Sequence, residues 1–338
     1  MRRLFLPLIA AAVASTALSA QAQTVLAVSS WVPATVPLSI ATRQWCDLLE
    51  KNTAGSMRCN ILPRAVANPP GTYDAIKSGL ADVSFAVPGY TPGRFVLPQI
   101  AEFPFLGDSA EAMSVAYHRI ATKYPQFSQE LGDVHVLAYF TDAPGMLLNT
   151  KRPVTRLEEL QGLKWRIGGG LVNEVANALG MNGTLKPATD TYELLSGGVM
   201  DGTVFPADAV EPFKLDKLIK YATAIPGGLY NTSFVLIMNK ARYEKLTPAE
   251  KKAVDAVSGE TAARLFGRGW DKADRRGLAL MQANGVPITR ADARFVADIK
   301  ARVAPVEVKW VERAKAKGLA DPAKALAEFR AEISKAAK

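Results

Sequence analysis

The amino-acid sequence predicts an α/β protein built from two domains. Short β-prone runs alternate with amphipathic helical segments, a rhythm typical of a mainly parallel sheet with helices on both faces. The chain has 338 residues, more than one compact core normally holds, and 49% of them are hydrophobic. In addition, one helical segment is long enough to cross from one domain to the other.

The first 22 residues predict a signal peptide. Two arginines precede an apolar run from Leu4 to Ala20, and Ala20-Gln21-Ala22 provides a small-residue cleavage site. The run is shorter than the roughly 20 residues of a membrane-spanning helix, and proline and hydroxyl residues interrupt it. We therefore expect a mature chain that begins near Gln23 and is exported to the periplasm.

A first α/β unit follows the signal segment. β-branched and aromatic residues dominate its strand segments, whereas apolar residues recur at helical spacing between them. The expected elements are strand 25–29, helix 38–51, strand 57–62, helix 72–77, strand 83–87, helix 110–124 and strand 134–140.

A second unit begins near Leu147. Thr155 with Glu158 three residues later predicts the start of a short helix at 157–160. The β-prone segment 232–238 is assigned back to the first sheet, so the chain crosses between the domains more than once. The other expected elements are strand 163–167, helix 172–179, strand 184–187, helix 191–195 and strand 202–205.

The C-terminal third is predicted to be largely helical. Thr247-Pro248-Ala249-Glu250 combines a capping threonine, a proline at the first helical position and a glutamate that can bond back to the cap. The helix that starts there should reach about Asn284, and its length of roughly 55 Å is enough to brace two domains. The remaining expected elements are strand 286–289 and basic helices within 291–337, kinked or broken at Pro305 and Pro322.

These assignments divide the chain into three parts. Residues 1–22 form the signal peptide. Residues 23–146 with about 231–272 form the first domain, and residues 147–230 with about 273–338 form the second domain and the C-terminal helices.

Composition and motifs argue against several function classes. The formal net charge is +9, but the basic residues concentrate in C-terminal helical sequence with acidic residues interspersed, which favours a solvated face over a nucleic-acid surface. His118 and His135 have no His, Cys or carboxylate at metal-ligand spacing. The sequence contains no Gly-x-Ser-x-Gly elbow and no phosphate-binding loop. We therefore expect a monomer without a cofactor that binds a small molecule rather than an enzyme.

Two cysteines lie 13 positions apart, Cys46 late in a predicted helix and Cys59 in the following strand. Oxidation is permitted in an exported chain, so a disulfide can form if the helix packs squarely over that strand. Two buried thiols are the alternative.

Arg166 is the leading candidate for ligand binding. It ends a predicted strand just before Gly168-Gly169-Gly170, at the edge of an α/β sheet where ligands gather. A guanidinium can hold a carboxylate through two parallel hydrogen bonds, which a lysine does not reproduce. A structural ion pair at the surface is the alternative. The glycine run lacks the spacing of a nucleotide loop and favours close backbone approach at an interdomain cleft.

The sequence resembles the DctP-type solute-binding proteins of tripartite ATP-independent periplasmic (TRAP) transporters. The resemblance implies a two-domain periplasmic binding protein fold that closes around a hinge, a ligand carboxylate gripped by Arg166, and membrane permease subunits as partners. The matching segments span nearly the whole mature chain: Glu50-Lys51-Asn52-Thr53-Ala54-Gly55, Ser78-Gly79-Leu80-Ala81-Asp82, Phe103-Pro104-Phe105, Asn149-Thr150-Lys151-Arg152-Pro153-Val154, the segment 162–167, Val199-Met200-Asp201-Gly202 and Met238-Asn239-Lys240.

Departures from the family pattern indicate the class of ligand. Phe205 stands where many members carry an amide that bonds ligand oxygen. Val87 and Gly145 stand where sialic-acid binders carry a glutamate and a second arginine. We therefore expect an aromatic or branched monocarboxylate, such as a 2-oxo or 2-hydroxy acid, rather than a polyhydroxylated sugar acid.

Further candidates surround this predicted site. Trp31, Tyr90 and Phe140 follow or end strands, as Phe205 does, and could form an aromatic-walled pocket, with core packing as the alternative for each. Arg94, in a loop, is a candidate second anion contact. Asn231 is a candidate hydrogen-bond partner at the hinge.

Two functional alternatives stay open beside transport. One is an exported enzyme on the same fold, for which the sequence offers no nucleophile with a base or metal. The other is a sensory binding protein that presents its ligand to a receptor.

Overall fold

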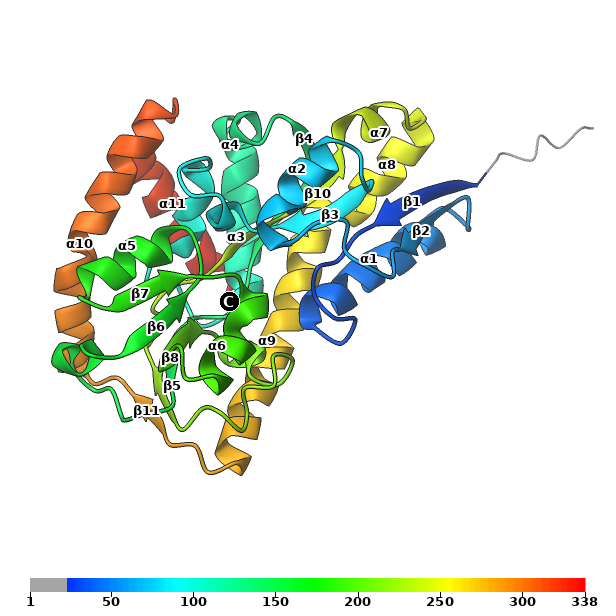
Figure 1. Ribbon diagram of the computed structural model, residues 1–338. Coiled ribbons are helices and arrows are strands. Elements are labelled where there is room, and N and C mark those ends of the chain that lie inside the picture. Colours follow the sequence, from blue (N-terminus) through cyan, green and yellow to red (C-terminus); the bar gives the residue numbers. More distant parts are fainter. Residues whose placement is uncertain (1–22, 338) are drawn as a thin grey trace, which may run out of the picture.

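The computed structural model describes residues 23–337 and consists of two β-sheets with helices packed around them (Figure 1). Within the described residues, one sheet has five strands and the other has six. The predicted signal peptide, residues 1–22, lies outside the described part of the chain. The α/β class with two domains, predicted from the alternation of elements, is confirmed.

The first sheet has the strand order β2-β1-β3-β10-β4. Strands β1, β2 and β3 are parallel, and β10 runs antiparallel to both β3 and β4. The segment that the sequence assigned back to the first sheet, now β10, lies between two strands of that sheet. The strand bounds are β1 Thr24–Val28, β2 Met57–Ile61, β3 Val83–Ala86, β4 Val134–Thr141 and β10 Ser233–Asn239.

The second sheet has the order β11-β9-β5-β8-β6-β7, in which β5 runs antiparallel to both of its neighbours. Each sheet is therefore mainly parallel with one reversed strand, β10 or β5. The sequence did not predict β5 and β9 as strands. The bounds are β5 Met146–Asn149, β6 Lys164–Ile167, β7 Asn182–Leu185, β8 Gly202–Phe205, β9 Tyr221–Ala224 and β11 Ile288–Arg290.

Both reversed strands, β5 and β10, begin where the chain crosses from one domain to the other. The connections β4 to β5 and β9 to β10 run side by side and are joined by backbone hydrogen bonds, from Gly145 N to Tyr230 O at 2.8 Å and from Leu229 N to Gly145 O at 2.9 Å. A Cβ at Gly145 would lie 2.1 Å from the Tyr230 ring, so only glycine lets these two connections approach so closely. These paired connections form the hinge.

Helices cover both sheets. The α-helix bounds are α1 Pro37–Asn52, α2 Thr72–Lys77, α3 Ala110–Lys123, α4 Gln126–Glu130, α5 Leu171–Ala178, α6 Thr191–Ser196, α7 Lys240–Glu244, α8 Pro248–Val257, α9 Gly259–Ala283, α10 Ala293–Ala316 and α11 Pro322–Ala336. Shorter 3-10 helices are η1 Pro69–Gly71, η2 Pro88–Tyr90, η3 Leu97–Glu102, η4 Leu157–Leu160, η5 Ala188–Asp190 and η6 Ala207–Ala209. The α-helices α4 and α7 were not predicted.

The long helix crosses both domains, as the sequence predicted, but it is not continuous. The capping box at Thr247 and Glu250 forms as expected. The chain then leaves helical geometry at Ser258, with φ −96° and ψ −158°, and Gly259 has φ +60°, so the helix divides into α8 and α9. Helix α9 packs on α1 and α3 of the first domain and on η6 of the second (Figure 1).

The C-terminal helices connect to both domains. Helix α10 packs on α5 and α11 packs on α3. Pro305 does not break α10, which continues from Ala293 to Ala316, whereas the helices do break before Pro322, where α11 begins. At the predicted start of helix 157–160, the backbone and hydroxyl of Thr155 donate to Glu159 rather than Glu158, and the helix is the 3-10 helix η4.

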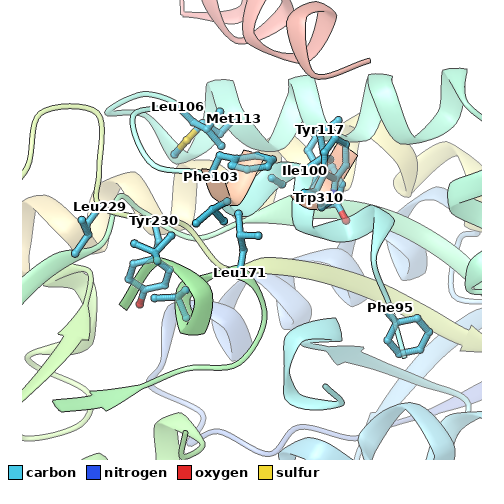
Figure 2. Packing of buried hydrophobic residues seen from close by; sticks show 14 of the residues in the cluster. Phe95, Ile100, Phe103, Leu106, Met113, Tyr117, Leu171, Leu229, Tyr230 and Trp310 are labelled. Carbon is cyan, nitrogen blue, oxygen red and sulfur yellow. The ribbon is translucent and has the colours of Figure 1, made fainter. Parts of the chain in front are cut away.

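A continuous apolar cluster joins the first domain, the second domain and α10. Phe103 of the first domain meets Trp310 of α10 edge to face at 5.5 Å, and the Trp310 indole donates to Val96 O at 2.9 Å. Leu171 of α5 and Tyr230 of the hinge belong to the same cluster (Figure 2). Apolar burial on this scale holds the two domains together.

The two cysteines are bonded to each other, and the two histidines pack against aromatic rings. Cys46 and Cys59 form a disulfide that ties α1 to β2. His135 stacks on Tyr243 at 3.5 Å, and His118 packs at 6.1 Å from the ring of Tyr139. Within residues 23–337, His, Cys, Asp and Glu side chains form no group suited to hold a metal ion. No helix in this part of the chain combines the length and apolar character needed to cross a membrane.

Candidate functional site

Arg166 occupies the interface between the two domains. Strand β6 buries every residue after Lys164, and Arg166 is only 1% exposed. Its Nε donates to Lys186 O at 3.0 Å, and the guanidinium carbon lies 4.4 Å from the centre of the Phe205 ring. Among the described residues, Nη1 of Arg166 has no hydrogen-bond partner although it is buried. The guanidinium is thus fixed in position with hydrogen-bonding capacity left over.

The glycine run after β6 brings the domains into backbone contact. A Cβ at Gly169 would lie 1.7 Å from Gly89 O, and Gly170 has φ +82°. Only glycine permits both the approach and the backbone conformation. The interpretation of this run as a close interdomain approach is therefore correct, and the approach places the loop after β3 against the end of β6.

Tyr90 reaches across the interface to the second domain. Its hydroxyl accepts a hydrogen bond from Ala188 N at 3.1 Å. Burial raises the pKa of Tyr90, and nearby Arg166 partly opposes that rise. Trp31 lies edge-on to Tyr90 at 6.2 Å and donates its indole N–H to Phe85 O at 3.3 Å. Trp31, Tyr90, Arg166 and Phe205 are therefore linked in one interdomain group.

Asn231 lies in the hinge and is 1% exposed. Both polar atoms of its side chain are buried, and neither has a hydrogen-bond partner within the described part of the chain. Beside it, Asp142 accepts from Thr232 N at 2.7 Å. A buried amide left without partners is costly in a closed protein, so Asn231 is suited to bind a polar ligand group.

Two candidates from the sequence lie apart from this group. Phe140 is fully buried and its ring stacks on Phe234 at 5.5 Å and on Phe266 at 4.2 Å, inside the core of the first domain. Arg94 pairs with Asp74 at 2.8 Å and lies over Tyr73 at 4.5 Å on the protein surface. Neither is brought against Arg166, because their strongest contacts lie within the first domain.

Glu102 is a buried interdomain carboxyl group that sequence reasoning missed. One oxygen accepts from Leu171 N at 2.7 Å, at the start of α5 in the second domain, and the other accepts from the Ser233 hydroxyl of the hinge strand. Burial raises its pKa to about 7. The one sequence signal was an acidic residue directly before the apolar Phe103-Pro104-Phe105 element.

Further carboxyl groups lie near the hinge and were also missed. Burial raises the pKa of Asp142 to about 7. Asp208, in η6, has its pKa raised well above the usual value, first by burial and then by Asp142 and Asp274. Asp274 of α9 accepts from the backbone N–H groups of Ala207 and Asp208 at 2.9 and 3.3 Å. In sequence, nothing distinguishes these aspartates from solvated ones.

The arrangement suits the binding of a small anion rather than covalent chemistry. It offers one fixed guanidinium, an amide and a hydroxyl beside aromatic rings, between domains joined by a hinge. Binding sites of this kind enclose a ligand with few polar groups that set its orientation.

Comparison with known proteins places the chain in a defined group. The family model for bacterial extracellular solute-binding proteins of family 7, DctP, matches residues 28–313. A solved TRAP periplasmic solute-binding protein from Bordetella bronchiseptica, with bound (R)- and (S)-mandelate, is 38% identical with a TM-score of 0.89, covering 92% of this chain and 99% of that one.

Two other proteins show similar likeness. A solved marine metagenome TRAP solute-binding protein, specific for aromatic acid ligands and in complex with 3-hydroxybenzoate, is 31% identical with a TM-score of 0.87, covering 94% of this chain and 99% of that one. The outer membrane transporter protein TsaT of Comamonas testosteroni is 28% identical, over 92% of each chain.

Proposed function

Because this chain belongs to the bacterial extracellular solute-binding proteins of family 7, which are non-enzymatic components of TRAP transporters, we propose that its ligand is an aromatic monocarboxylate. The resemblance to DctP-type proteins is confirmed, and the alternative of an exported enzyme is removed. The family implies a small-molecule ligand and a TRAP membrane transporter as partners. A sensory role stays as the second candidate, because it would use the same binding site.

The burial and hydrogen bonding of Arg166 are the main support for the proposal. It is buried, held in place through Nε and by the Phe205 ring, and left with a terminal nitrogen that no described group satisfies. Burying an unpaired guanidinium is unfavourable, whereas a carboxylate ligand would supply both the opposite charge and paired acceptors. A single arginine favours a monocarboxylate over a dicarboxylate, because a second buried carboxylate would lack a partner.

The aromatic side chains support a ring-bearing ligand. Phe205 lies beside Arg166 and stacks on Phe213 at 5.6 Å, while Trp31 and Tyr90 face the interface from the first domain. Apolar contact contributes about 25 cal/mol per Å² of buried area, whereas each sugar hydroxyl left without a partner costs on the order of 1 kcal/mol. The bound mandelate and 3-hydroxybenzoate of the two solved relatives agree with this choice.

In the proposed cycle, the open protein binds the acid, the domains close around the hinge, and the closed form docks on the membrane subunits in the periplasm. Ligand favours closure only through its higher affinity for the closed state. Glu102 and Tyr90 each accept a hydrogen bond across the interface, and these two hydrogen bonds would be broken in an open form. Export by the predicted signal peptide belongs to the same proposal.

Titration calorimetry against a panel of acids tests the ligand class. The panel contains mandelate, benzoate and 3-hydroxybenzoate, a branched 2-oxo acid, galacturonate and succinate. We expect an aromatic acid to bind most tightly. Tightest binding of galacturonate or succinate would reject the proposal.

Substitution of Phe205 tests the role of its ring. We expect Phe205→Asn to weaken binding of the aromatic acids and to narrow their advantage over galacturonate, because apolar contact is lost and a polar partner is gained. Tyr192→Asn, an exposed aromatic residue of the same domain, is the matched control and should leave the order of affinities unchanged. An unaltered advantage in Phe205→Asn would mean that this ring does not contact the ligand.

A further inference from the structure

The segment after β8 holds a carboxyl group that the proposed function does not yet use. Asp208 follows Phe205 by three residues and is 7% exposed. Its Oδ1 atom is buried and, counting every residue from 23 to 337, has no hydrogen-bond partner. A buried polar atom in this state indicates that a group outside the chain completes its bonding.

The backbone beneath Asp208 is rigidly held. Asp274 of α9 accepts from the N–H groups of both Ala207 and Asp208. The helix approaches so closely that a Cβ at Gly277 would lie 1.9 Å from Ala207 O. Both backbone N–H groups therefore bond Asp274. These bonds fix the backbone that carries the Asp208 carboxyl group, as precise recognition requires.

Asp208 and Arg166 both act on the pKa of Tyr230, a buried tyrosine of the hinge. The pKa of Tyr230 is raised well above its usual value by burial, and Asp142, Arg166, Tyr90 and Asp208 all act on it. The Tyr230 hydroxyl donates to Val204 O at 3.0 Å, next to Phe205 in β8. Titratable groups of both domains, Asp208 among them, thus influence this one tyrosine.

We propose that the Asp208 carboxyl group hydrogen-bonds an oxygen substituent that the ligand carries in addition to its carboxylate, such as the hydroxyl of a 2-hydroxy acid. The inference rests on the proposed function and names the residue that sets the preference within its ligand class. Burial, with Asp142 and Asp274 nearby, raises the pKa of Asp208, which favours its protonated form and so lessens repulsion of the ligand carboxylate. Arg166 binds the carboxylate, and Asp208 distinguishes hydroxylated from plain acids.

A matched ligand pair tests this assignment. (R)-Mandelate and phenylacetate differ by one hydroxyl group, so the ratio of their affinities reports the contact to that hydroxyl. By calorimetry, Asp208→Ala should lower the affinity for mandelate about tenfold and change that for phenylacetate by less than about twofold. Asp208→Asn keeps a polar group of similar size and should lower the ratio less. Asp298→Ala, which removes an exposed aspartate on α10, is the control.

The outcomes separate the two proposals. If Asp208→Ala weakens both ligands equally, or neither, the assignment of Asp208 is overturned while the aromatic-acid function stands. If neither ligand binds the wild-type protein, this inference is overturned, and the calorimetric panel of acids decides separately whether the proposed function stands. Thermal unfolding of each variant checks that it folds, and should Asp208→Ala not fold, an unchanged affinity ratio in Asp208→Asn overturns the assignment in its place.

Discussion

Within residues 23–337, two arginines lie over aromatic rings, and their surroundings differ. In the interdomain region, Arg166 is 1% exposed, lies over Phe205 and retains a buried nitrogen without a partner among residues 23–337. In the surface region, the Arg94 side chain is 32% exposed, lies over Tyr73 and is paired with Asp74. An arginine over an aromatic ring is therefore buried with an unpaired nitrogen in one region and exposed with an acidic partner in the other. Unused hydrogen-bonding capacity in a buried place, rather than the presence of an arginine, is what supports Arg166 as the proposed ligand contact.

The carboxyl groups of the two regions show the same contrast. Burial raises the pKa of Glu102 in the interdomain region, whereas Lys77 lowers the pKa of exposed Asp133, which also approaches Arg94 at 3.7 Å. Burial between the domains thus imposes a desolvation cost on one set of carboxyl groups, and pairing at the surface does not. Three predictions test this contrast, ordered by the size of the expected effect.

The largest effect concerns Glu102 and pH. Its pKa rises from 4.5 to about 7 on folding, so its stabilising contribution is complete below pH 4.5 and is lost as the pH rises through about 7. The change amounts to about 3 kcal/mol, and Glu102→Gln should remove it from the pH dependence. Urea unfolding followed by tryptophan fluorescence across this range measures it. A pH slope identical in the wild type and Glu102→Gln would show that Glu102 ionises freely. Asp133→Asn is the surface control.

The second effect concerns Arg166. Arg166→Lys retains the charge but loses the planar fork and the stacking on Phe205, so we expect a roughly hundredfold loss of aromatic-acid affinity in a protein that still folds. Calorimetry measures the affinity, and circular dichroism checks the fold. Undiminished affinity in a folded variant would remove Arg166 from the site.

The smallest effect concerns Arg94. Arg94→Ala breaks its pairing with Asp74 and uncovers Tyr73, and exposed ion pairs contribute only about 0 to 1 kcal/mol. We expect a slight loss of thermal stability and ligand affinity within about twofold of the wild type. A large loss of affinity would show that the surface region also contributes to binding.

The sequence alone determined those features that depend on neighbours along the chain. The alternation of strands and helices, the capping box at Thr247 and the helix start at Pro322 follow from local hydrogen bonding and backbone preference. The sequence also predicted that Arg166 lies near a strand end and that glycines follow it, because strand ends and turns depend on consecutive residues. Family resemblance then supplied the two-domain architecture.

Only the tertiary structure decided which polar groups are buried and which of them are satisfied. Phe140 ends a strand as predicted but packs between Phe234 and Phe266, and Arg94 finds acidic partners on its own domain. Glu102 and Asp208 look like solvated residues in sequence but are buried in the folded protein. Burial and hydrogen-bond satisfaction depend on contacts between segments far apart in the chain, so no local pattern specifies them.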